Sequence, residues 1–328
     1  MIRRLRIFES TCVDPYWNLA VEKHLMDLTK PGECILYLWQ NQNTVVIGQN
    51  QNPWVECRTS LLESEGGKLA RRLSGGGAVF HDLGNLNFTF LLSQEDYDVP
   101  RQLSVIQAAC AMTGIHAEQS GRNDLLAGGR KFSGNAFYHS ADRAYHHGTL
   151  LIDADLEKLQ RYLSPSKAKL EAKGVASVRS RVVNLSTLSP GLTCQRMKTN
   201  MSAAFEDVYG LPAEPVLLTS ADYSVIEELR TEYSSWDYLY GTPLPFSFEC
   251  QARFPWGGIQ LQLQAKDGII TTAKVYSDAM DWQLPAALER ALSGCRFNLT
   301  DMSTALRCAV PDSQTALDLC AMLSEQSI

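Results

Sequence analysis

The spacing of hydrophobic residues along the chain predicts a mixture of strands and helices. Apolar side chains alternate with polar ones in residues 3–8 and 86–90, which is the period of a half-buried strand. From Trp17 to Leu28 they recur at helical spacing after Asp14-Pro15, which favours a helix start with Asp14 as N-cap. Further strands are predicted at residues 35–39, 44–47, 132–138 and 145–152, and further helices at 52–65, 102–113, 154–163, 167–173, 192–209 and 222–233.

A change of composition near residue 243 predicts a second domain. Residues 241–245 read Gly-Thr-Pro-Leu-Pro, and two prolines with a glycine in five residues favour a linker. We therefore expect a large domain at residues 1–243 and a small α+β domain at residues 246–328 of this 328-residue chain. In the small domain, strand-like runs at 246–254, 259–264 and 269–276 precede helix-like segments at 285–292 and 314–323.

The composition is that of an ordinary globular protein, with 45% hydrophobic and 20% charged residues. A net charge of −6 indicates no basic face of the kind that nucleic-acid-binding proteins carry, so we expect no nucleic-acid partner. The nine cysteines are scattered without a CxxC pair, which argues against a disulfide framework and a zinc site. No apolar run approaches the ~18 residues of a membrane span. We expect a cytoplasmic protein with reduced thiols and no membrane partner.

A glycine-rich loop is the first candidate for chemistry. Residues 71–81 read Arg-Arg-Leu-Ser-Gly-Gly-Gly-Ala-Val-Phe-His between two predicted strands. Successive glycine N–H groups can form an anion-binding nest, and Ser74 with Arg71 or Arg72 can bind phosphate or carboxylate. A tight turn with solvated arginines explains the same residues. The loop is not a Walker A loop, because no Gly-Lys-Ser/Thr follows, and it is not a Rossmann fingerprint.

A second glycine-rich segment carries Lys131. The pair Asn123-Asp124 precedes residues 128–134, Gly-Gly-Arg-Lys-Phe-Ser-Gly, which are typical of a hairpin. A lysine held there can stabilise the negative charge that develops on phosphates during adenylate formation. Asp124 is a candidate to orient this lysine or to help hold Mg²⁺ through the phosphates. A solvated surface lysine is the simpler interpretation of Lys131 taken by itself.

Three histidines lie close to these segments. His81 ends the glycine loop, and His146-His147 begins a predicted strand. Neighbours on a strand point to opposite faces, so this pair is not expected to hold one metal ion, and we expect no metal site made of protein side chains. Each histidine taken singly fits a structural role.

Several separate motifs together resemble the lipoate–protein ligase A family, within the biotin/lipoate A/B protein ligases. The motifs follow one another in order over nearly the whole chain, and a small C-terminal domain follows them. They are residues 18–22 (Asn-Leu-Ala-Val-Glu), 44–48 (Thr-Val-Val-Ile-Gly), 71–85 (the glycine loop and Asp-Leu-Gly-Asn after it), 123–124, 130–136 (Arg-Lys-Phe-Ser-Gly-Asn-Ala), 146–151 (His-His-Gly-Thr-Leu-Leu) and 169–185.

The resemblance implies a fold and a reaction. The fold would be α+β, the biotin/lipoate protein ligase catalytic fold, in which helices flank a mixed β-sheet and a small C-terminal α+β domain follows. Lipoate and ATP, with Mg²⁺, would give lipoyl-AMP and pyrophosphate. The lipoyl group would then pass to a lysine of an apo lipoyl domain of a 2-oxoacid dehydrogenase complex or of the glycine cleavage H protein. We expect a monomer.

The resemblance also implies roles for particular residues. Lys131 would be the catalytic residue and would contact both ATP and the lipoyl carboxylate. ATP would further contact Arg72, Gly77, Ala78, Val79 and Phe80, and lipoate would contact Arg71, Ser74 and His81. Secondary candidates are Gly75, Gly76, Asn123, Asp124, His147, Lys173, Arg179 and Arg181. The last three lie in residues 166–184, a basic run that would cover the adenylate or is simply a solvated loop.

Three other functions fit parts of the same sequence. A cysteine-dependent octanoyltransferase of the same fold would need a nucleophilic thiol, and none of the nine cysteines lies in the glycine loop or beside Lys131. The sequence does not clearly distinguish the ligase from a lipoyltransferase that uses preformed lipoyl-AMP. An adenylate-sensing regulator that binds DNA would need an N-terminal helix-turn-helix, whereas residues 3–8 are predicted to form a strand.

Overall fold

The structure is a computed structural model that describes residues 1–121, 123–163, 181–240, 248–266, 268–310 and 313–326. It divides into two compact units. The first comprises Met1–Val46, Cys57–Arg71 and Val79–Leu239, and the second comprises Ile47–Glu56, Arg72–Ala78 and Tyr240–Ile328. The second unit thus includes most of the glycine loop as well as the C-terminal residues. The linker predicted at 241–245 and the boundary at 243–246 lie outside the described residues.

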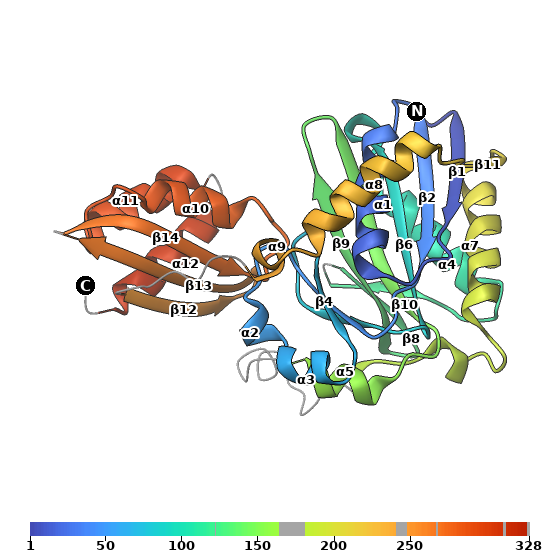
Figure 1. Ribbon diagram of the computed structural model, residues 1–328, viewed down its shortest axis with the longest axis horizontal. Helices are drawn as coiled ribbons and strands as arrows, with labels where there is room; N and C mark the ends of the chain where they lie inside the picture. The colour runs from blue at the N-terminus through green and yellow to red at the C-terminus, as the bar shows by residue number, and fades with distance from the viewer. Residues whose placement is uncertain (122, 164–180, 241–247, 267, 311–312, 327–328) are drawn as a thin grey trace. The chain divides into compact units, whose positions relative to one another are not determined.

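A mixed eight-stranded sheet is the centre of the first unit (Figure 1). Its strands, in order across the sheet, are β11 (Ala213–Pro215), β1 (Arg4–Glu9), β2 (Glu33–Trp39), β6 (Asn85–Ser93), β10 (Arg143–Leu151), β9 (Arg130–His139), β8 (Asp124–Ala127) and β7 (Glu118–Ser120). β1 runs parallel to β11 and β2, and the pairs from β2 to β7 are antiparallel.

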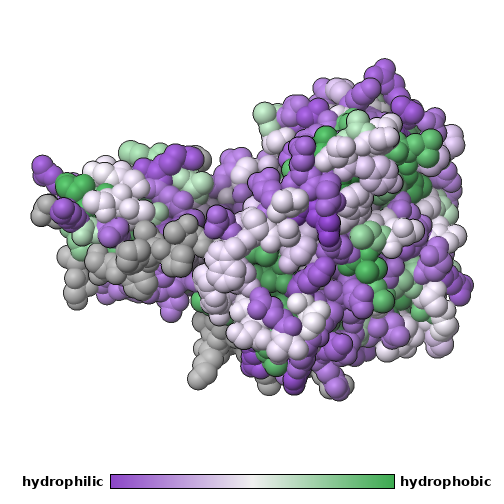
Figure 2. Space-filling view, viewed as in Figure 1, coloured by the Kyte–Doolittle hydropathy of each residue, from purple (hydrophilic) through white to green (hydrophobic). Residues whose placement is uncertain are grey.

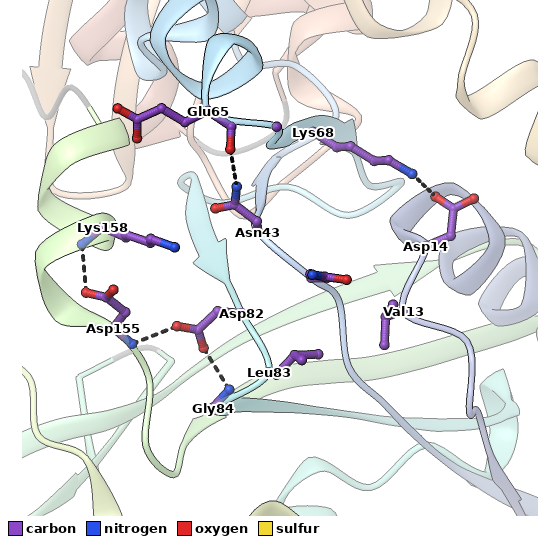
Figure 3. A pocket seen from close by; sticks show the side chains of 12 residues that line it. Val13, Asp14, Asn43, Glu65, Lys68, Asp82, Leu83, Gly84, Asp155 and Lys158 are labelled. Atoms are coloured by element: carbon purple, nitrogen blue, oxygen red, sulfur yellow. Dashed lines mark hydrogen bonds and ion pairs between the residues drawn. The ribbon is translucent and has the colours of Figure 1, made fainter.

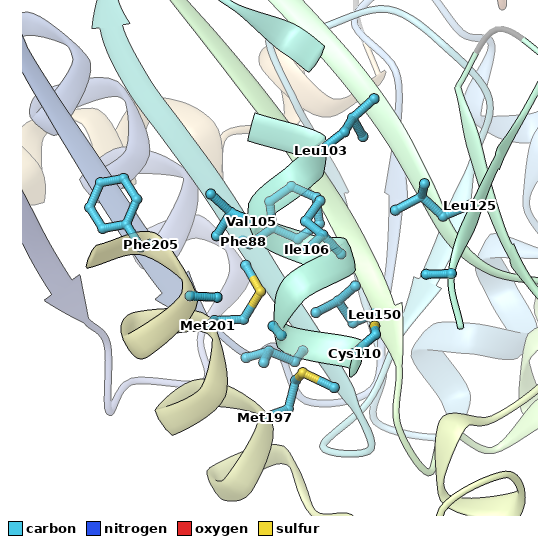
Figure 4. Close-up of a cluster of buried hydrophobic side chains, with 14 of the residues drawn as sticks. Phe88, Leu103, Val105, Ile106, Cys110, Leu125, Leu150, Met197, Met201 and Phe205 are labelled. Atoms are coloured by element: carbon cyan, nitrogen blue, oxygen red, sulfur yellow. The ribbon is translucent and has the colours of Figure 1, made fainter. Parts of the chain in front are cut away.

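Helices cover both faces of this sheet, so its central strands are apolar on both sides. In β2, Cys34 and Leu36 belong to one buried cluster, and Ile35 and Tyr37 belong to another. α4 (Val99–Ala111) and α7 (Cys194–Tyr209) pack on the first face, where Figure 4 shows side chains of both helices around Phe88. α1 (Pro15–Leu28) and α8 (Ser220–Tyr233) pack on the second face. The mixed sheet flanked by helices confirms the predicted fold class.

A smaller three-stranded sheet carries the ends of the glycine loop. Its order is β4 (Lys68–Arg71), β3 (Thr44–Ile47) and β5 (Val79–His81). The single helix predicted at 52–65 is instead two short helices, α2 (Pro53–Glu56) and α3 (Thr59–Ser64). Between them Cys57 forms a β-bridge with Leu163, at the end of α5 (Leu156–Tyr162), and this long-range pairing interrupts the helix. The other short helices are η1 (Gln94–Asp96), η3 (Leu185–Thr187) and α9 (Trp236–Tyr240).

The C-terminal part of the second unit is a three-stranded antiparallel sheet with helices packed against it. The strands are β12 (Phe248–Phe254), β13 (Gly257–Lys266) and β14 (Ile269–Ser277). Along β13 buried Ile259, Leu261 and Leu263 alternate with half-exposed glutamines. The helices are α10 (Leu284–Leu292), α11 (Leu299–Ala309) and α12 (Ser313–Ser324). The sequence prediction missed α11, although its N-cap Asn298, which accepts from the Asp301 N–H, is a local signal.

Figure 2 shows hydrophilic side chains over most of the drawn face of each unit, with hydrophobic ones in smaller groups between them. Singly exposed apolar side chains are ordinary on protein surfaces. Among the described residues, no helix combines the length and the apolar composition that crossing a membrane requires.

Candidate functional site

Lys131 lies next to a tight turn at the start of β9. Gly128 and Gly129 both have positive φ, 55° and 73°, as the type I′ turn between β8 and β9 requires. Nζ of Lys131 is 2.7 Å from Oδ1 of Asp124, with 34% and 27% of the two side chains exposed. An ion pair at this exposure adds little stability, so its main effect is to determine where the ammonium lies. Asp124 is placed to orient Lys131, and the catalytic role of both stays a prediction.

Gly134 leaves the space in which the Lys131 side chain lies. A Cβ at Gly134 would be 2.9 Å from Nζ and 3.1 Å from Cε of Lys131. The register between β8 and β9 also shifts at this point: Leu125 pairs with Ser133, and the next residue pairs with Lys131. The extra residue, Phe132, is fully buried in the core. A bulge of this kind redirects the neighbouring side chain, and here the ammonium lies across Gly134.

The chain after residue 180 runs along the other side of Lys131. The Val183 N–H donates to the Lys131 carbonyl at 2.9 Å, and Val182 forms a parallel bridge with Lys131. Arg181 precedes this bridge, and its buried Nε has no hydrogen-bond partner in the described part of the chain. Lys173 and Arg179, the other two candidates in this run, lie outside the described residues.

Asn123 holds the two strands of the hairpin together beside the ion pair. Its Nδ2 donates to the Asn135 carbonyl at 2.8 Å. In return the backbone N–H and Nδ2 of Asn135 donate to the Asn123 carbonyl at 2.8 and 3.0 Å. Asn123 therefore has a bracing position, which needs no ligand contact.

A line of buried contacts joins His81 to His147 on the α1 side of the sheet. The His81 ring lies edge-on to Trp39, with centroids 6.0 Å apart. Nε1 of Trp39 donates to Oγ1 of Thr89 at 3.2 Å, and this hydroxyl donates to Oε1 of Glu22 at 2.7 Å. Nδ1 of His147 lies 2.8 Å from the same carboxylate oxygen. The line brings side chains of β5, β2, β6, α1 and β10 together in the apolar core.

Sequence reasoning did not select three members of this line, Glu22, Trp39 and Thr89. Glu22 is only 2% exposed, and a buried carboxylate is costly unless it is hydrogen-bonded. The signal was a charged residue on the apolar stripe of α1, three positions before Leu25. Trp39 and Thr89 carry no comparable local signal, because both lie on strands that are buried throughout.

The tautomer of His81 follows from its neighbours. Nδ2 of Asn18 donates to the carbonyls of Cys12 and Gln40 at 3.0 and 2.9 Å and to Oδ1 of Asn41 at 2.9 Å. Asn41 therefore presents its Nδ2 to Nδ1 of His81, 3.3 Å away. Nδ1 accepts, and the proton of the neutral ring is on Nε2. In this tautomer the N–H of His81 lies on the ring edge away from Asn41.

The paired histidines point to opposite faces of the sheet, as predicted. His147 meets Glu22 of α1, whereas His146 lies between Gln102 of α4 and Asn135. Burial, and secondarily the neighbouring His147, lowers the pKa of His146 to about 3. Within the described ranges no group of three or more His, Cys, Asp or Glu side chains is arranged to hold a metal ion.

Arg71, predicted to contact lipoate, is bound to backbone oxygens of α9. Its Nε donates to the Tyr238 carbonyl at 3.0 Å, and its Nη2 donates to the Leu239 carbonyl. Carbonyls at the C-terminus of a helix attract a cation. Arg71 therefore links β4 to α9 in the first unit.

Arg72 is folded into its own loop in the second unit. Nε donates to Oγ of Ser74 at 3.0 Å, and Nη2 donates to the carbonyls of Gly75 and Gly77, both at 2.8 Å. Arg72 is 6% exposed, and Ser74 is fully buried. In this arrangement Arg72 braces the loop from within, and its contact with ATP stays a prediction.

Part of the predicted anion nest is bonded to protein. The Gly76 N–H donates to the Ala279 carbonyl at 3.0 Å, within the second unit. A Cβ at Gly75 would lie 2.4 Å from the same oxygen, and one at Gly48 would lie 2.3 Å from the Gly76 carbonyl. Only glycine fits at these close backbone approaches. The glycines of the loop therefore serve packing as well as any ligand.

The remaining predicted ATP contacts follow the loop into β5. Gly77, Ala78 and Val79 are half-buried. The Phe80 ring is 2% exposed and packs against Tyr162 with centroids 5.5 Å apart. Any contact that Phe80 makes with a nucleotide would therefore come from its backbone.

A separate polar pocket of about 700 Å³ lies in the first unit (Figure 3). Several of its charged groups are used in structural bonds. Asp82 accepts from the N–H groups of Gly84 and Asp155 at 2.9 and 2.7 Å, and Lys68 binds Asp14 at 3.0 Å. Neither Lys131 nor Arg71 lines the pocket, so we do not assign the reaction to it.

Comparisons with known proteins agree with these features. The family described as the lipoyl protein ligase A/B catalytic domain matches residues 14–206, and the bacterial lipoate protein ligase C-terminus matches residues 244–318. A lipoate-protein ligase A of Bdellovibrio bacteriovorus is 42% identical over 97% of this chain and 96% of that protein. P. falciparum LipL1, crystallised with lipoate, has a TM-score of 0.84 at 26% identity, over 98% of this chain and 100% of that one. A lipoate-protein ligase A bound with ATP has a TM-score of 0.64 at 25% identity, over 74% of this chain and 99% of that one.

Proposed function

Because the chain belongs to the lipoyl protein ligase A/B family, we propose that it joins lipoate to ATP as lipoyl-AMP and then transfers the lipoyl group to a protein lysine. In the first step a lipoate carboxylate oxygen attacks the α-phosphorus of ATP, and pyrophosphate leaves. In the second step the acceptor amine attacks the lipoyl carbonyl carbon, and AMP leaves.

The observation that carries the proposal is the placement of Lys131. Its ammonium is held by Asp124 at 2.7 Å and lies across Gly134. A fixed cation stabilises the charge that develops when pyrophosphate leaves, and it costs no reorganisation at that moment. The carboxylate partner on the adjacent strand and the space above Gly134 together support this role for Lys131.

The other reactants are assigned around this lysine. We place lipoate along the line from His81 to His147, where the N–H of His81 and the Glu22 carboxylate are the polar groups. Arg71 and Ser74 remain proposed lipoate contacts. ATP would meet Arg72 and residues 77–80, with Mg²⁺ carried on its phosphates, where the ion neutralises charge. We assign Asp124 to orienting Lys131, because its Oδ1 already binds that ammonium.

We propose apo lipoyl domains of 2-oxoacid dehydrogenase complexes and the glycine cleavage H protein as acceptors, and a monomeric enzyme in the cytoplasm. The family match over catalytic and C-terminal domains supports the acceptor class.

The test is a reconstituted reaction with purified protein, lipoate, Mg-ATP and an apo lipoyl domain. We expect the release of one pyrophosphate and the addition of one lipoyl mass to a single carrier lysine. Intact mass spectrometry of the carrier measures this addition. Lys131→Ala should abolish adenylate formation. Octanoate run in parallel measures chain selectivity, because an apolar site discriminates weakly between acids of similar length.

The second candidate, transfer from preformed lipoyl-AMP only, is separated by the same assay. It predicts no lipoate-dependent pyrophosphate release but full transfer when synthetic lipoyl-AMP is supplied. If only octanoyl carrier protein serves as donor, both assignments are wrong.

A further inference from the structure

A buried histidine with no role in the mechanism above is joined to the Lys131 hairpin by hydrogen bonds. His146 is fully buried, with its ring edge-on to Phe88 at 5.4 Å. Its Nε2 lies 2.8 Å from Oδ1 of Asn135, and its Nδ1 lies 3.0 Å from the atom assigned as Oε1 of Gln102, an amide whose O and N can be exchanged by a flip. Gln102 is fully buried on α4, so the chain of bonds begins in the core of the sheet's far face.

The direction of each bond follows from the partners of Asn135. Its Nδ2 donates to the Asn123 carbonyl at 3.0 Å, so its Oδ1 faces His146 and accepts. Burial keeps the His146 ring neutral, with its pKa near 3, so its single proton is on Nε2 and Nδ1 accepts. Gln102 must then present its –NH₂ to Nδ1. With its oxygen there, two acceptors would face each other, and its buried Nε2 has no hydrogen-bond partner among the described residues.

The chain continues into the strand that orients the lysine. Asn123 and Asn135 exchange backbone and side-chain hydrogen bonds of 2.8 to 3.0 Å. The next residue, Asp124, pairs with Gly134 across β8 and β9 and binds Nζ of Lys131 at 2.7 Å. Four successive contacts therefore separate a core helix from the ammonium.

Gly148 provides a second, independent indication that the fold accommodates the Asn135 side chain in this position. A Cβ there would lie 2.9 Å from Oδ1 of Asn135 and 2.6 Å from the ring of Phe88. The glycine after the histidine pair therefore leaves the space that the Asn135 amide occupies. His146 and Gly148 lie two positions apart on β10, and side chains two positions apart share a face of the sheet.

We propose that Gln102, His146 and Asn135 form a directed hydrogen-bond chain that sets the position of the Lys131–Asp124 pair. His146 is then a positioning residue for adenylate formation, acting as a neutral Nε2–H donor. The catalytic consequence rests on the proposed function, whereas the tautomer and the placement of Lys131 do not. A neutral imidazole suits this role because its one donor and one acceptor give the chain a single direction.

The kinetic test compares two replacements of His146. His146→Leu fills the site but removes the donor, and it should lower kcat for lipoate-dependent pyrophosphate release by roughly 10-fold or more, since small misplacement of a catalytic group is costly. KM for lipoate should stay near the wild-type value. His146→Gln places an amide N–H where Nε2 was and should restore most of kcat. His139→Leu, on the far part of β9, is the matched control and should keep wild-type kcat.

Two measurements do not depend on ligase activity. In ¹⁵N NMR of the wild type, the His146 proton should be on Nε2. In acetic anhydride labelling read by peptide mass spectrometry, the ratio of Lys131 to Lys158 modification should rise several-fold in His146→Leu and not in His139→Leu.

The possible outcomes distinguish a failure of the proposed function from a failure of the proposed hydrogen-bond chain. If the wild type releases no pyrophosphate with lipoate, the proposed function is wrong, and the NMR and labelling results still decide the positioning chain. A proton on Nδ1 of wild-type His146 overturns the chain even if the leucine variant does not fold. Wild-type kcat and unchanged Lys131 labelling in a folded His146→Leu protein overturn it as well.

Discussion

Replacing Gly134 with alanine would fill the space in which the Lys131 side chain lies. The new Cβ would be 2.9 Å from Nζ and 3.1 Å from Cε, whereas ordinary carbon contacts begin near ~3.5 Å. Only the end of a flexible side chain and Oγ1 of Thr149 at 4.0 Å lie within reach, and no backbone atom does. The ammonium must therefore move by roughly 0.6 Å, which lengthens or redirects its 2.7 Å contact with Asp124.

The expected result is a folded protein with impaired chemistry. Gly134 is not among the glycines with positive φ, so alanine fits its backbone and should stabilise the strand by roughly 0.5–1 kcal/mol. Displacing a catalytic group by about 1 Å costs up to ~100-fold in rate. The displacement here is smaller, so we expect kcat for lipoate-dependent pyrophosphate release to fall roughly 10-fold, while the urea midpoint stays the same or rises.

Two controls make this prediction sharp. In a Lys131→Ala background no side chain lies across residue 134, so Gly134→Ala should stabilise the protein at least as much as it does in the wild-type background. Gly114→Ala, at a positive φ of 76° with no atom within 4 Å, should lose about 1–2 kcal/mol of stability and keep wild-type kcat. Wild-type kcat in Gly134→Ala, or a double variant that is less stable than Lys131→Ala, would refute the reasoning.

Three further predictions concern the neighbouring contacts. In the folded protein burial lowers the pKa of His146 to about 3, so the ring stays neutral, whereas in the unfolded chain it takes up a proton below about pH 6.5. The free energy of unfolding should therefore fall as the pH drops below 6.5, by about 2 kcal/mol at pH 5. Urea titrations at pH 7 and pH 5 should show that His146→Gln lacks this part of the pH dependence; an equal dependence in both proteins would contradict it. Glu22→Leu leaves His147 without its carboxylate partner and should lower the free energy of unfolding, measured by urea titration, by about 3 kcal/mol. A loss below ~1 kcal/mol would show that the contact between Glu22 and His147 is weak. Gly75→Ala places a Cβ 2.4 Å from the Ala279 carbonyl oxygen, a backbone atom that cannot move without disturbing the chain. The free energy of unfolding should therefore fall by about 1–3 kcal/mol in thermal unfolding, and an unchanged Tm would disprove this.

Local patterns in the sequence were sufficient for many of the elements and for the family resemblance. Pro15 at the start of α1, the Gly128-Gly129 turn and the strand at 259–264 each depend on neighbouring residues, and the structure confirms all three. The mixed sheet with flanking helices, which the family resemblance implied, is also present. Where a long-range contact intervened, local patterns were insufficient: the bridge of Cys57 with Leu163 divides the helix predicted at 52–65.

The uses of the individual site residues were decided by tertiary structure. Sequence placed Arg71 and Arg72 side by side in one motif, yet Arg71 binds the carbonyls of α9, and Arg72 turns into its own loop. The contact of Glu22 with His147 joins positions 125 residues apart, and no local pattern encodes a distance of that kind. Backbone preferences depend on a few neighbouring residues, whereas a hydrogen bond between distant segments exists only once the sheet and its helices have packed. The sequence by itself therefore determined which residues to examine, and packing decided what each of them touches.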